Sequence, residues 1–314
     1  MIVMCCLAFA VQTHAQQIAE ADKQAAIQGI VNQIAVHYFD AGKGGRIASQ
    51  LQTEYHQGGF ARANDWKDFD QLVTSALARY SKDNHLYVRY DPETVALLRS
   101  RPNSEGRQGR LSTHPGGSKH YGFEETSVLE GNIGYMRISE INLSEASLPV
   151  LRAAMEKVRD TRALIIDLRD NEGGHSSVGP VLESYFLPAG RPLLQYQGRD
   201  GQKRIDSTLD MREGKRYEQP VYILVNRKTA SAAEAFAFAL QQYKRASIAG
   251  ERSAGDAYQN EWFVIDDNNY VSVSTTVPSM PGKSQSWQQR GVLPDIRSRS
   301  SDAVGELVAR IRQH

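Results

Sequence analysis

The sequence has little cysteine, no excess of charge of either sign, and no long apolar run after its first residues. Its only two cysteines, Cys5 and Cys6, lie in the opening apolar stretch. The remainder of the chain therefore forms no disulfide and cannot use thiol chemistry. The formal net charge is +1 and 23% of the residues are charged. This composition gives no support for a function in binding nucleic acid or a membrane surface.

Sequence motifs for metals and nucleotides are also missing. The chain contains no His-Glu-x-x-His sequence, no Cys-x-x-Cys pair and no phosphate-binding glycine loop. We therefore expect no metal ion, nucleotide or other cofactor. No segment after the first residues is long and apolar enough to span a bilayer, so we do not expect a transmembrane protein.

The chain opens with an apolar stretch of the kind found in export signals. Residues 1–11 are apolar, and Thr13, His14 and Ala15 follow as a plausible signal-peptidase cleavage site before Gln16. We interpret residues 1–15 as a signal peptide, although no Lys or Arg precedes the apolar run. This interpretation predicts a secreted or periplasmic protein.

Residues 16–98 are predicted to form a small helical bundle that ends in a strand. The helices are expected at residues 25–38, 46–55 and 65–80, where apolar residues recur at helical spacing. The glycine-rich residues 42–45 are expected to break the first helix from the second. Such a bundle is too thin to be a catalytic core but is suited to capping one.

The segment at residues 99–118 is rich in Gly, Ser, Pro and Arg. We predict an exposed linker loop there; it could contact an anionic group of a substrate, but a solvated linker is the preferred interpretation. Strands and helices alternate over residues 119–314, which predicts an α/β layered domain with a mostly parallel sheet. The expected strands are residues 133–138, 163–168, 221–225 and 247–249, with a hairpin of residues 262–265 and 270–276. The expected helices are residues 145–158, 177–186, 232–243 and 302–312.

Ser231 is the first candidate for catalysis. It follows the apolar strand run Val221–Val225 and immediately precedes a run of strong helix formers. Unpaired N–H groups and the positive end of the helix dipole meet at such a junction and favour an oxyanion. The sequence Ser231-Ala-Ala-Glu234 also has the form of a capping box, in which Ser231 would be an ordinary N-cap.

Two histidines are candidates for a general base. His85 lies in a turn, and a strand is expected to begin directly after it. Asp83 is a local hydrogen-bond partner for His85. His175 follows the pair Gly173-Gly174 and is a rival base. Since most histidines are structural, sequence position alone does not assign either of them.

Several segments together resemble the tail-specific and tricorn-like serine peptidase family. In chain order they are Asp167-Leu-Arg-Asp-Asn-Glu-Gly-Gly174, Thr229-Ala-Ser-Ala-Ala-Glu234, Gly250-Glu251 with Gly255, and Gly291-Val-Leu-Pro-Asp-Ile296. The helical region with Asp83-Asn-His85-Leu86 resembles the branch that contains the interphotoreceptor retinoid-binding protein. The resemblance implies a crotonase-like (ClpP/crotonase) α/β catalytic domain after the bundle. It also implies a serine endopeptidase that hydrolyses a peptide or protein substrate.

The resemblance implies a role for each site residue. Ser231 would attack the peptide carbonyl, His85 would take and return its proton, and Gln288 would orient His85. Backbone N–H groups of Ala232 and of Gly173 or Gly174 would bind the developing oxyanion. The glycine pair has an ordinary explanation as well, because a tight turn between strand and helix often uses two glycines.

The chain departs from the family pattern at two positions. The tail-specific branch has a lysine base where this chain has Asp256, so we do not expect a Ser-Lys dyad. Asp256 is interpreted as a loop aspartate or as a contact to His85 or substrate. The tricorn-like branch has a glutamate where this chain has Gln288, which leaves open a reduced activity or another carboxylate in that role.

The runner-up hypothesis is a catalytically silent relative that binds a hydrophobic small molecule or a peptide. The presence of both Ser231 and His85 favours the enzyme. Gln288 and Asp256, at the two positions that depart from the family pattern, favour the catalytically silent relative. The family often carries a peptide-binding PDZ insertion. The interval between His85 and Gly131 is too short for one, so no PDZ domain is expected.

Overall fold

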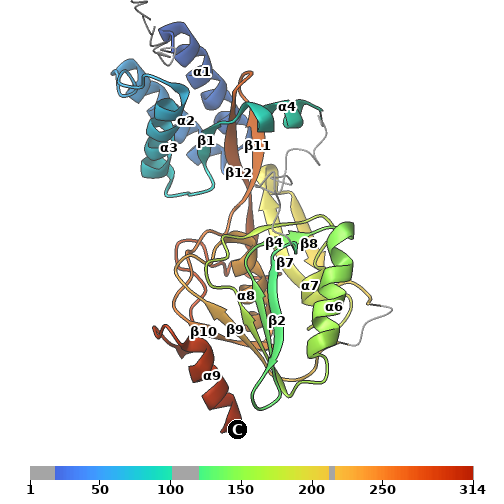
Figure 1. Cartoon of the computed structure of the whole chain (residues 1–314). Coiled ribbons are helices and arrows are strands. Elements are labelled where there is room, and N and C mark those ends of the chain that lie inside the picture. Colours follow the sequence, from blue (N-terminus) through green and yellow to red (C-terminus); the bar gives the residue numbers. More distant parts are fainter. Residues whose placement is uncertain (1–17, 101–119, 212–215, 314) are drawn as a thin grey trace, which may run out of the picture.

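A computed structural model describes residues 18–100, 120–211 and 216–313. The predicted signal peptide at residues 1–15 lies outside them, as does the predicted linker apart from its first two residues. Figure 1 shows two lobes joined by long strands. We call them the helical lobe, built from residues 18–100 with the hairpin of β11 (Gln259–Val264) and β12 (Asn269–Ser279), and the sheet lobe, built from the remaining described residues.

Three helices form most of the helical lobe, and their apolar faces share one core. They are α1 (Glu20–His37), α2 (Ala41–His56) and α3 (Trp66–Ser81), followed by strand β1 (Tyr87–Tyr90) and helix α4 (Pro92–Ser100). Ile30, Leu51 and Phe69 lie fully buried in the shared core. The three predicted helices and the strand after His85 are confirmed.

The predicted break at residues 42–45 is wrong, because α2 begins at Ala41 and contains these glycines. The Asp40 side chain caps α2 by accepting a hydrogen bond from the Lys43 N–H at 2.8 Å. A Cβ on Gly44 would lie only 2.9 Å from Cβ of Tyr38. Glycine at this position therefore lets α2 start directly against the end of α1, and cap and packing outweigh its low helix propensity.

The hairpin of β11 (Gln259–Val264) and β12 (Asn269–Ser279) extends into the helical lobe (Figure 1). Strand β1 pairs with β12 in the antiparallel sense, with Tyr87 opposite Ser272. Phe263, Val271 and Val273 of the hairpin are buried in the core of the helical lobe. The predicted hairpin is confirmed, but it packs with the N-terminal helices instead of with the domain predicted for residues 119–314.

A six-stranded sheet organises the sheet lobe, in the order β13-β10-β9-β5-β3-β2. The strands are β2 (Phe123–Leu129), β3 (Ile133–Ile138), β5 (Ala163–Asp167), β9 (Val221–Val225), β10 (Ala246–Gly250) and β13 (Ile296–Arg297). All neighbours are parallel except β2, which runs antiparallel to β3 at the edge. The mixed α/β fold with a mostly parallel sheet is therefore confirmed. Its central strands β5 and β9 are mostly apolar and buried, as expected for strands covered on both faces.

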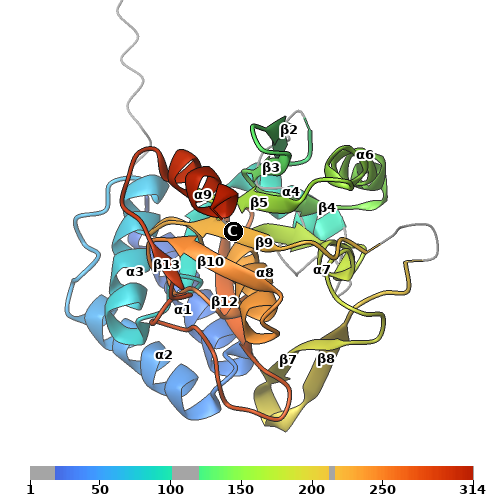
Figure 2. The same ribbon diagram turned by 90° about the horizontal axis from the view of Figure 1, so that it is seen from below.

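Helices cover both faces of this sheet (Figure 2). Helices α6 (Leu148–Val158) and α8 (Ser231–Gln242) pack on one face, and α9 (Ala303–Arg312) packs on the other. Among the helices of the described ranges, none combines the length and the apolar character needed to cross a membrane. An antiparallel hairpin of β7 (Pro192–Gly198) and β8 (Lys203–Ser207) extends from this lobe, and β7 pairs with the far end of β12.

The helix predicted at residues 177–186 shrinks to a single turn, α7 (Val181–Ser184). The chain before it is held extended, because β6 (Gly174–Ser176) pairs in parallel with β4 (Ile141–Leu143). The Ser177 N–H continues this pairing by donating to the Leu143 carbonyl at 2.8 Å. The pairing of β4 with β6 brings the predicted Gly173-Gly174 turn to the start of α8.

Candidate active site

Ser231 occupies a strained turn between β9 and α8. Its φ is +52°, a left-handed conformation that is uncommon for a residue other than glycine. Ala230 is the N-cap of α8 and has no side-chain cap hydrogen bond. The interpretation of Ser231 as an ordinary N-cap is therefore wrong, and its hydroxyl is not used by the helix.

Glu234 supplies the other half of the predicted capping box. Its Oε2 accepts hydrogen bonds from the N–H groups of Ser231 at 3.0 Å and Asp256 at 2.8 Å. Its Oε1 accepts from the Gly255 N–H at 2.7 Å and from the Ser253 hydroxyl. Burial raises the pKa of this fully buried carboxyl, while the hydrogen bonds lower it. Glu234 thus joins the strained turn to the loop that carries Asp256.

His85 comes from the other lobe and meets Ser231. Its Nε2 lies 3.2 Å from Oγ of Ser231, although the two residues are 146 positions apart. The backbone of His85 is held in place by the hairpin, since the Ser272 hydroxyl donates to the His85 carbonyl at 2.6 Å. The rival His175 lies on β6 and lines the same cleft. The hydroxyl of Ser231 and the imidazole of His85 therefore lie within hydrogen-bond distance of each other.

Asp83 lies behind His85 in a fully buried position. Its Oδ1 accepts a hydrogen bond from the His85 N–H at 3.0 Å, and its Oδ2 accepts from the Tyr38 hydroxyl at 3.0 Å. Burial raises the pKa of the Asp83 carboxyl, and a positive charge on His85 lowers it. The second ring nitrogen of His85, Nδ1, is buried without a hydrogen-bond partner in the part of the chain that the structure describes.

Gln288 does not contact His85, and the predicted orienting hydrogen bond is absent. Its Oε1 accepts a hydrogen bond from the Ala257 N–H at 2.7 Å. The amide therefore supports the loop after Gly255 instead of the imidazole. Asp256 contacts the residue beside His85, because its Oδ1 accepts from Nδ2 of Asn84 at 2.9 Å.

The glycine turn lies directly against the nucleophile turn. A Cβ on Gly173, whose φ is +108°, would lie 2.7 Å from Cβ of Ser231 and 3.1 Å from the Ala232 nitrogen. Only glycine permits this close approach at a positive φ. The Gly173 N–H is not available for an oxyanion, because it donates to Oδ1 of Asn171 at 2.9 Å.

Two other backbone donors remain near the hydroxyl. Ile141 donates its N–H to the Gly173 carbonyl at 2.8 Å and pairs with Gly174 in the parallel ladder. In this pattern the N–H of Gly174 itself points away from β4. The Ala232 N–H is in the first turn of α8 and has no acceptor within the described ranges. Of the three residues predicted for the oxyanion hole, Gly174 and Ala232 retain a free donor.

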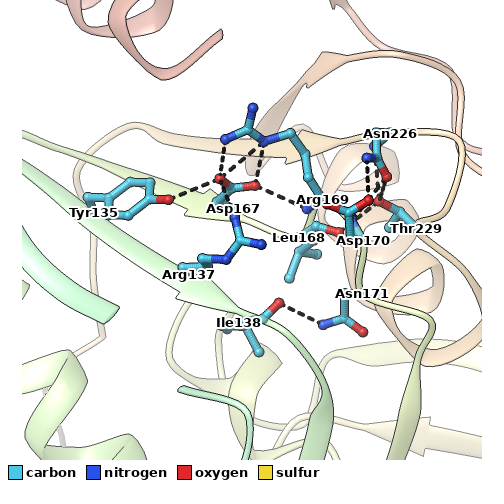
Figure 3. A network of polar contacts seen from close by, with 10 residues as sticks. All are labelled: Tyr135, Arg137, Ile138, Asp167, Leu168, Arg169, Asp170, Asn171, Asn226 and Thr229. Atoms are coloured by element: carbon cyan, nitrogen blue, oxygen red, sulfur yellow. Dashed lines mark hydrogen bonds and ion pairs between the residues drawn. The ribbon is translucent and has the colours of Figure 1, made fainter. Parts of the chain in front are cut away.

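A network around Asp167 fixes the loop that leads to the glycine turn (Figure 3). The fully buried Asp167 carboxylate accepts from the Tyr135 hydroxyl at 3.0 Å and from Nη2 of Arg169 at 2.6 Å. Hydrogen bonding to Asp167 raises the pKa of the Arg169 guanidinium. The Thr229 hydroxyl links this loop to the nucleophile turn by donating to the Leu168 carbonyl at 2.8 Å.

A cleft of about 450 Å³ opens over Ser231. Ile141, Leu143, Phe236 and Trp287 form apolar parts of its wall. Its lining also includes the carboxyl groups of Glu183, Asp206 and Glu261, which sequence reasoning missed. The sequence around Glu183 does not reveal this acidic group, because the residues that surround Glu183 in the cleft come from the distant strands β7, β8 and β11. Nowhere in the described ranges do three or more His, Cys, Asp or Glu side chains gather as a metal site.

Comparison with known proteins shows that the chain is similar in sequence to proteins named as peptidases. The chain is 29% identical over 222 residues to the chloroplastic carboxyl-terminal-processing peptidase 2 of Arabidopsis thaliana, which covers 67% of this chain and 39% of that protein. It is 38% identical over 163 residues to the tail-specific protease of Haemophilus influenzae, which covers 51% of this chain and 21% of that protein. The chain thus spans well under half the length of these curated relatives.

The fold also has a solved counterpart. A lipoprotein from Streptococcus agalactiae superposes with a TM-score of 0.62 at 18% identity, covering 98% of this chain and 99% of that one. At this identity the likeness concerns the fold alone. Residues 132–298 match the sequence pattern of peptidase family S41, and they make up more than half of the 314 residues. With this match, and with the strand, glycine turn and serine turn that it spans, the chain belongs to peptidase family S41.

Proposed function

We propose that the protein is a serine endopeptidase that hydrolyses peptide bonds of a peptide or protein substrate. The observation that carries this proposal is the 3.2 Å separation of the Ser231 hydroxyl and the His85 imidazole. A serine hydroxyl is a weak nucleophile until a base within hydrogen-bond reach removes its proton. Family membership supports the same reaction.

In this proposal His85 takes the proton of Ser231 at Nε2 and later gives it to the leaving amine. Nε2 must then be the acceptor in the resting state, so the hydrogen of the neutral ring is on Nδ1. A positive charge on His85 lowers the pKa of the buried Asp83 carboxyl, so the two groups interact, and Asp83 also holds the His85 backbone. We assign to Asp83 a stabilising role, in place of the orienting role that the sequence suggested for Gln288. Its negative charge would stabilise the imidazolium that forms when His85 takes the proton.

The oxyanion would be bound by the N–H groups of Ala232 and Gly174. Both are free of other acceptors within the described residues, and the positive end of the α8 dipole adds to their effect. The loss of one such donor raises a reaction barrier by about 3 kcal/mol. Gly173 contributes space instead of a donor, because its missing side chain leaves room beside Ser231.

The proposal is tested with a fluorophosphonate probe, which reacts with activated serines. We expect the wild-type protein to be labelled and Ser231→Ala to remain unlabelled. Ser177→Ala is the matched control, because Ser177 lines the same cleft and its hydroxyl is near the Leu143 carbonyl at 3.3 Å. Equal labelling of a folded wild type and Ser231→Ala would contradict the proposal. Absent labelling with retained binding of a peptide or an apolar small molecule would favour the catalytically silent alternative.

Finer assignments are part of the same proposal. The layers of helix, sheet and helix support a ClpP/crotonase-like catalytic domain over residues 119–314, capped by the helical bundle of residues 16–98. The Asp83-Asn-His85 segment supports the branch that contains the interphotoreceptor retinoid-binding protein. A secreted or periplasmic location rests on the apolar residues 1–11 and the predicted cleavage after Ala15.

A further inference from the structure

The cleft over Ser231 has both apolar and acidic side chains in its wall. Leu143 and Phe236 are among the apolar ones. α7 and β8 contribute the carboxyl groups of Glu183 and Asp206. One continuous cavity therefore joins the proposed nucleophile, an apolar passage and a pair of acids.

The charges of the two acids are compensated unequally. Asp206 forms an ion pair with Arg204, whose guanidinium also lies 4.5 Å from the ring centroid of Tyr196. Glu183 has no cationic partner among the described residues. Burial raises the pKa of Glu183 to about 7, and the neighbouring Asp206 carboxylate contributes to the same rise. This site thus has a carboxyl group whose ionised form lacks a counter-charge.

We propose that the acidic part of this cleft, with Glu183 and Asp206, binds the cationic side chain of a substrate lysine or arginine located next to the scissile bond. The inference rests on the proposed peptidase function and names its substrate class. Lysine and arginine have an apolar stem and a charged end, and they bury the stem while the charge finds a polar partner. The stem fits the apolar passage, and the charged end reaches Glu183.

Several other side chains of the cleft influence the charge of Glu183. The other titratable or charged side chains in the lining are His175, Tyr196, Arg204, Asp206, Tyr258 and Glu261. Arg204 is held by Asp206 on one side and donates to Oε1 of Gln259 at 3.2 Å on the other. The Asp206 carboxylate therefore offsets the positive charge of Arg204. Acids outnumber the arginine in this lining, so the balance favours a cationic ligand over an anionic one.

The test compares matched peptides that differ only in the two residues flanking the scissile bond. Each flanking position carries lysine, norleucine or glutamate in turn, because norleucine keeps the apolar stem of lysine without its charge. We expect kcat/KM for lysine to exceed that for norleucine about ten- to one-hundredfold at one position, the effect of one hydrogen bond to a charged group. Glu183→Gln should reduce this ratio to near one while the norleucine peptide is cleaved as in the wild type. Glu156→Gln, which removes a surface carboxylate paired with Arg159, should leave the ratio unchanged.

Failure of the inference and failure of the proposed function give different results. Ser231-dependent cleavage with no preference for lysine, or a preference that survives Glu183→Gln, overturns the basic site and leaves the peptidase standing. Absent cleavage of every peptide overturns the peptidase. Fluorescence anisotropy with inactive Ser231→Ala then tests the site separately, because lysine peptides should bind it about tenfold more tightly than norleucine peptides. Equal binding of the two overturns the basic site in that case as well.

Discussion

Two buried carboxylates flank the proposed reacting pair, and they act on it from opposite sides. Glu234 holds the backbone of Ser231 in its left-handed conformation, and Asp83 holds the backbone of His85. Both are fully buried, so neither touches bulk water. Isolated buried charges are costly, and the hydrogen bonds to these two groups offset that cost.

The role of Asp83 predicts a specific kinetic defect in Asp83→Asn. The amide oxygen still accepts from the His85 N–H, so the turn keeps its shape, but the negative charge is lost. We expect kcat to fall by about two to four orders of magnitude while KM changes little, since Asp83 has no contact with the cleft. Tyr38→Phe removes the hydrogen bond to Oδ2 and keeps the charge, so its kcat should stay within about tenfold of wild type. A kcat for Asp83→Asn equal to that of Tyr38→Phe would exclude the charge as the cause.

Glu234→Gln should weaken both the fold and the reaction. The carboxylate accepts four hydrogen bonds, whereas the amide nitrogen of glutamine accepts none and would face N–H donors. Leaving a buried N–H unpaired costs about 1–3 kcal/mol, so the free energy of unfolding should fall by at least that amount. Urea denaturation measures the loss of unfolding free energy. Probe labelling of Ser231 under native conditions should fall, because the turn that positions Ser231 is loosened. Full stability together with full labelling would show that Glu234 does not hold the turn.

Glu183 predicts a pH dependence of stability. Its pKa in the folded protein is about 7, above the ordinary value of 4.5. As the pH rises between these two values, the unfolded chain releases the proton first. The free energy of unfolding should therefore fall across this window, by at most about 3 kcal/mol. Burial raises the pKa of Glu234 and Asp206 in the same direction, so the measured quantity is the difference between wild type and Glu183→Gln. Identical urea midpoints for the two proteins across this pH range would contradict the raised pKa.

At the scale of elements, the junction of β6 and α8 depends on a residue without a side chain. Gly173→Ala would place a Cβ 2.7 Å from Cβ of Ser231 at a φ of +108°. Gly190→Ala is the matched control, because Gly190 also has a positive φ, of +69°, but nothing lies within 4 Å of its Cβ position. We expect Gly190→Ala to cost about 1 kcal/mol of unfolding free energy with normal kcat/KM. Gly173→Ala should cost more and reduce kcat/KM at least about tenfold. Equal behaviour of the two would show that only backbone strain matters at Gly173.

Elements that depend on local pattern were predictable, and those that depend on distant partners were not. The buried strands β5 and β9 are continuous apolar runs, and α3 has a clear apolar stripe. The start of α2 was mispredicted because a side-chain cap and contact with α1 outweighed its glycines. Strand β12 was recognised, but its pairing with β1 joins segments far apart in the chain and leaves no local signal.

The same distinction applies to the candidate site. Ser231, His85 and Glu234 were predictable because each belongs to a short motif. The partner of Gln288 was not, because the amide is free to face either the imidazole or the Ala257 N–H, and only the folded loop decides between them. Glu183 and Asp206 were missed for a related reason. Glu183 lies on α7 and Asp206 on β8, and the two residues line the same cleft only in the folded protein.

At the scale of the whole molecule, Ser231 and His85, the proposed reacting pair, come together only because two lobes meet. β12 runs through both lobes and sets the position of β1, and thereby that of His85 (Figure 1). Side-chain contacts complete the junction beside the site. Asn84 donates to Asp256 at 2.9 Å, and Gln289 donates to the Lys82 carbonyl at 3.2 Å. The sequence resemblance aligns Asp256 with the lysine base of the tail-specific branch; in this chain Asp256 instead binds Asn84, the neighbour of the proposed base His85.

The bond between Asn84 and Asp256 therefore predicts coupling between two residues that do not themselves react. Loss of one hydrogen bond costs about 0.5–1.5 kcal/mol, so Asn84→Ala and Asp256→Ala should each lower kcat/KM roughly three- to tenfold by loosening the approach of His85. Because both changes remove the same contact, the double variant should be no worse than the more impaired single variant. Asp256→Asn retains an acceptor oxygen for Asn84 and should restore most of the activity. Additive losses in the double variant would instead assign Asp256 a role of its own, in contact with substrate.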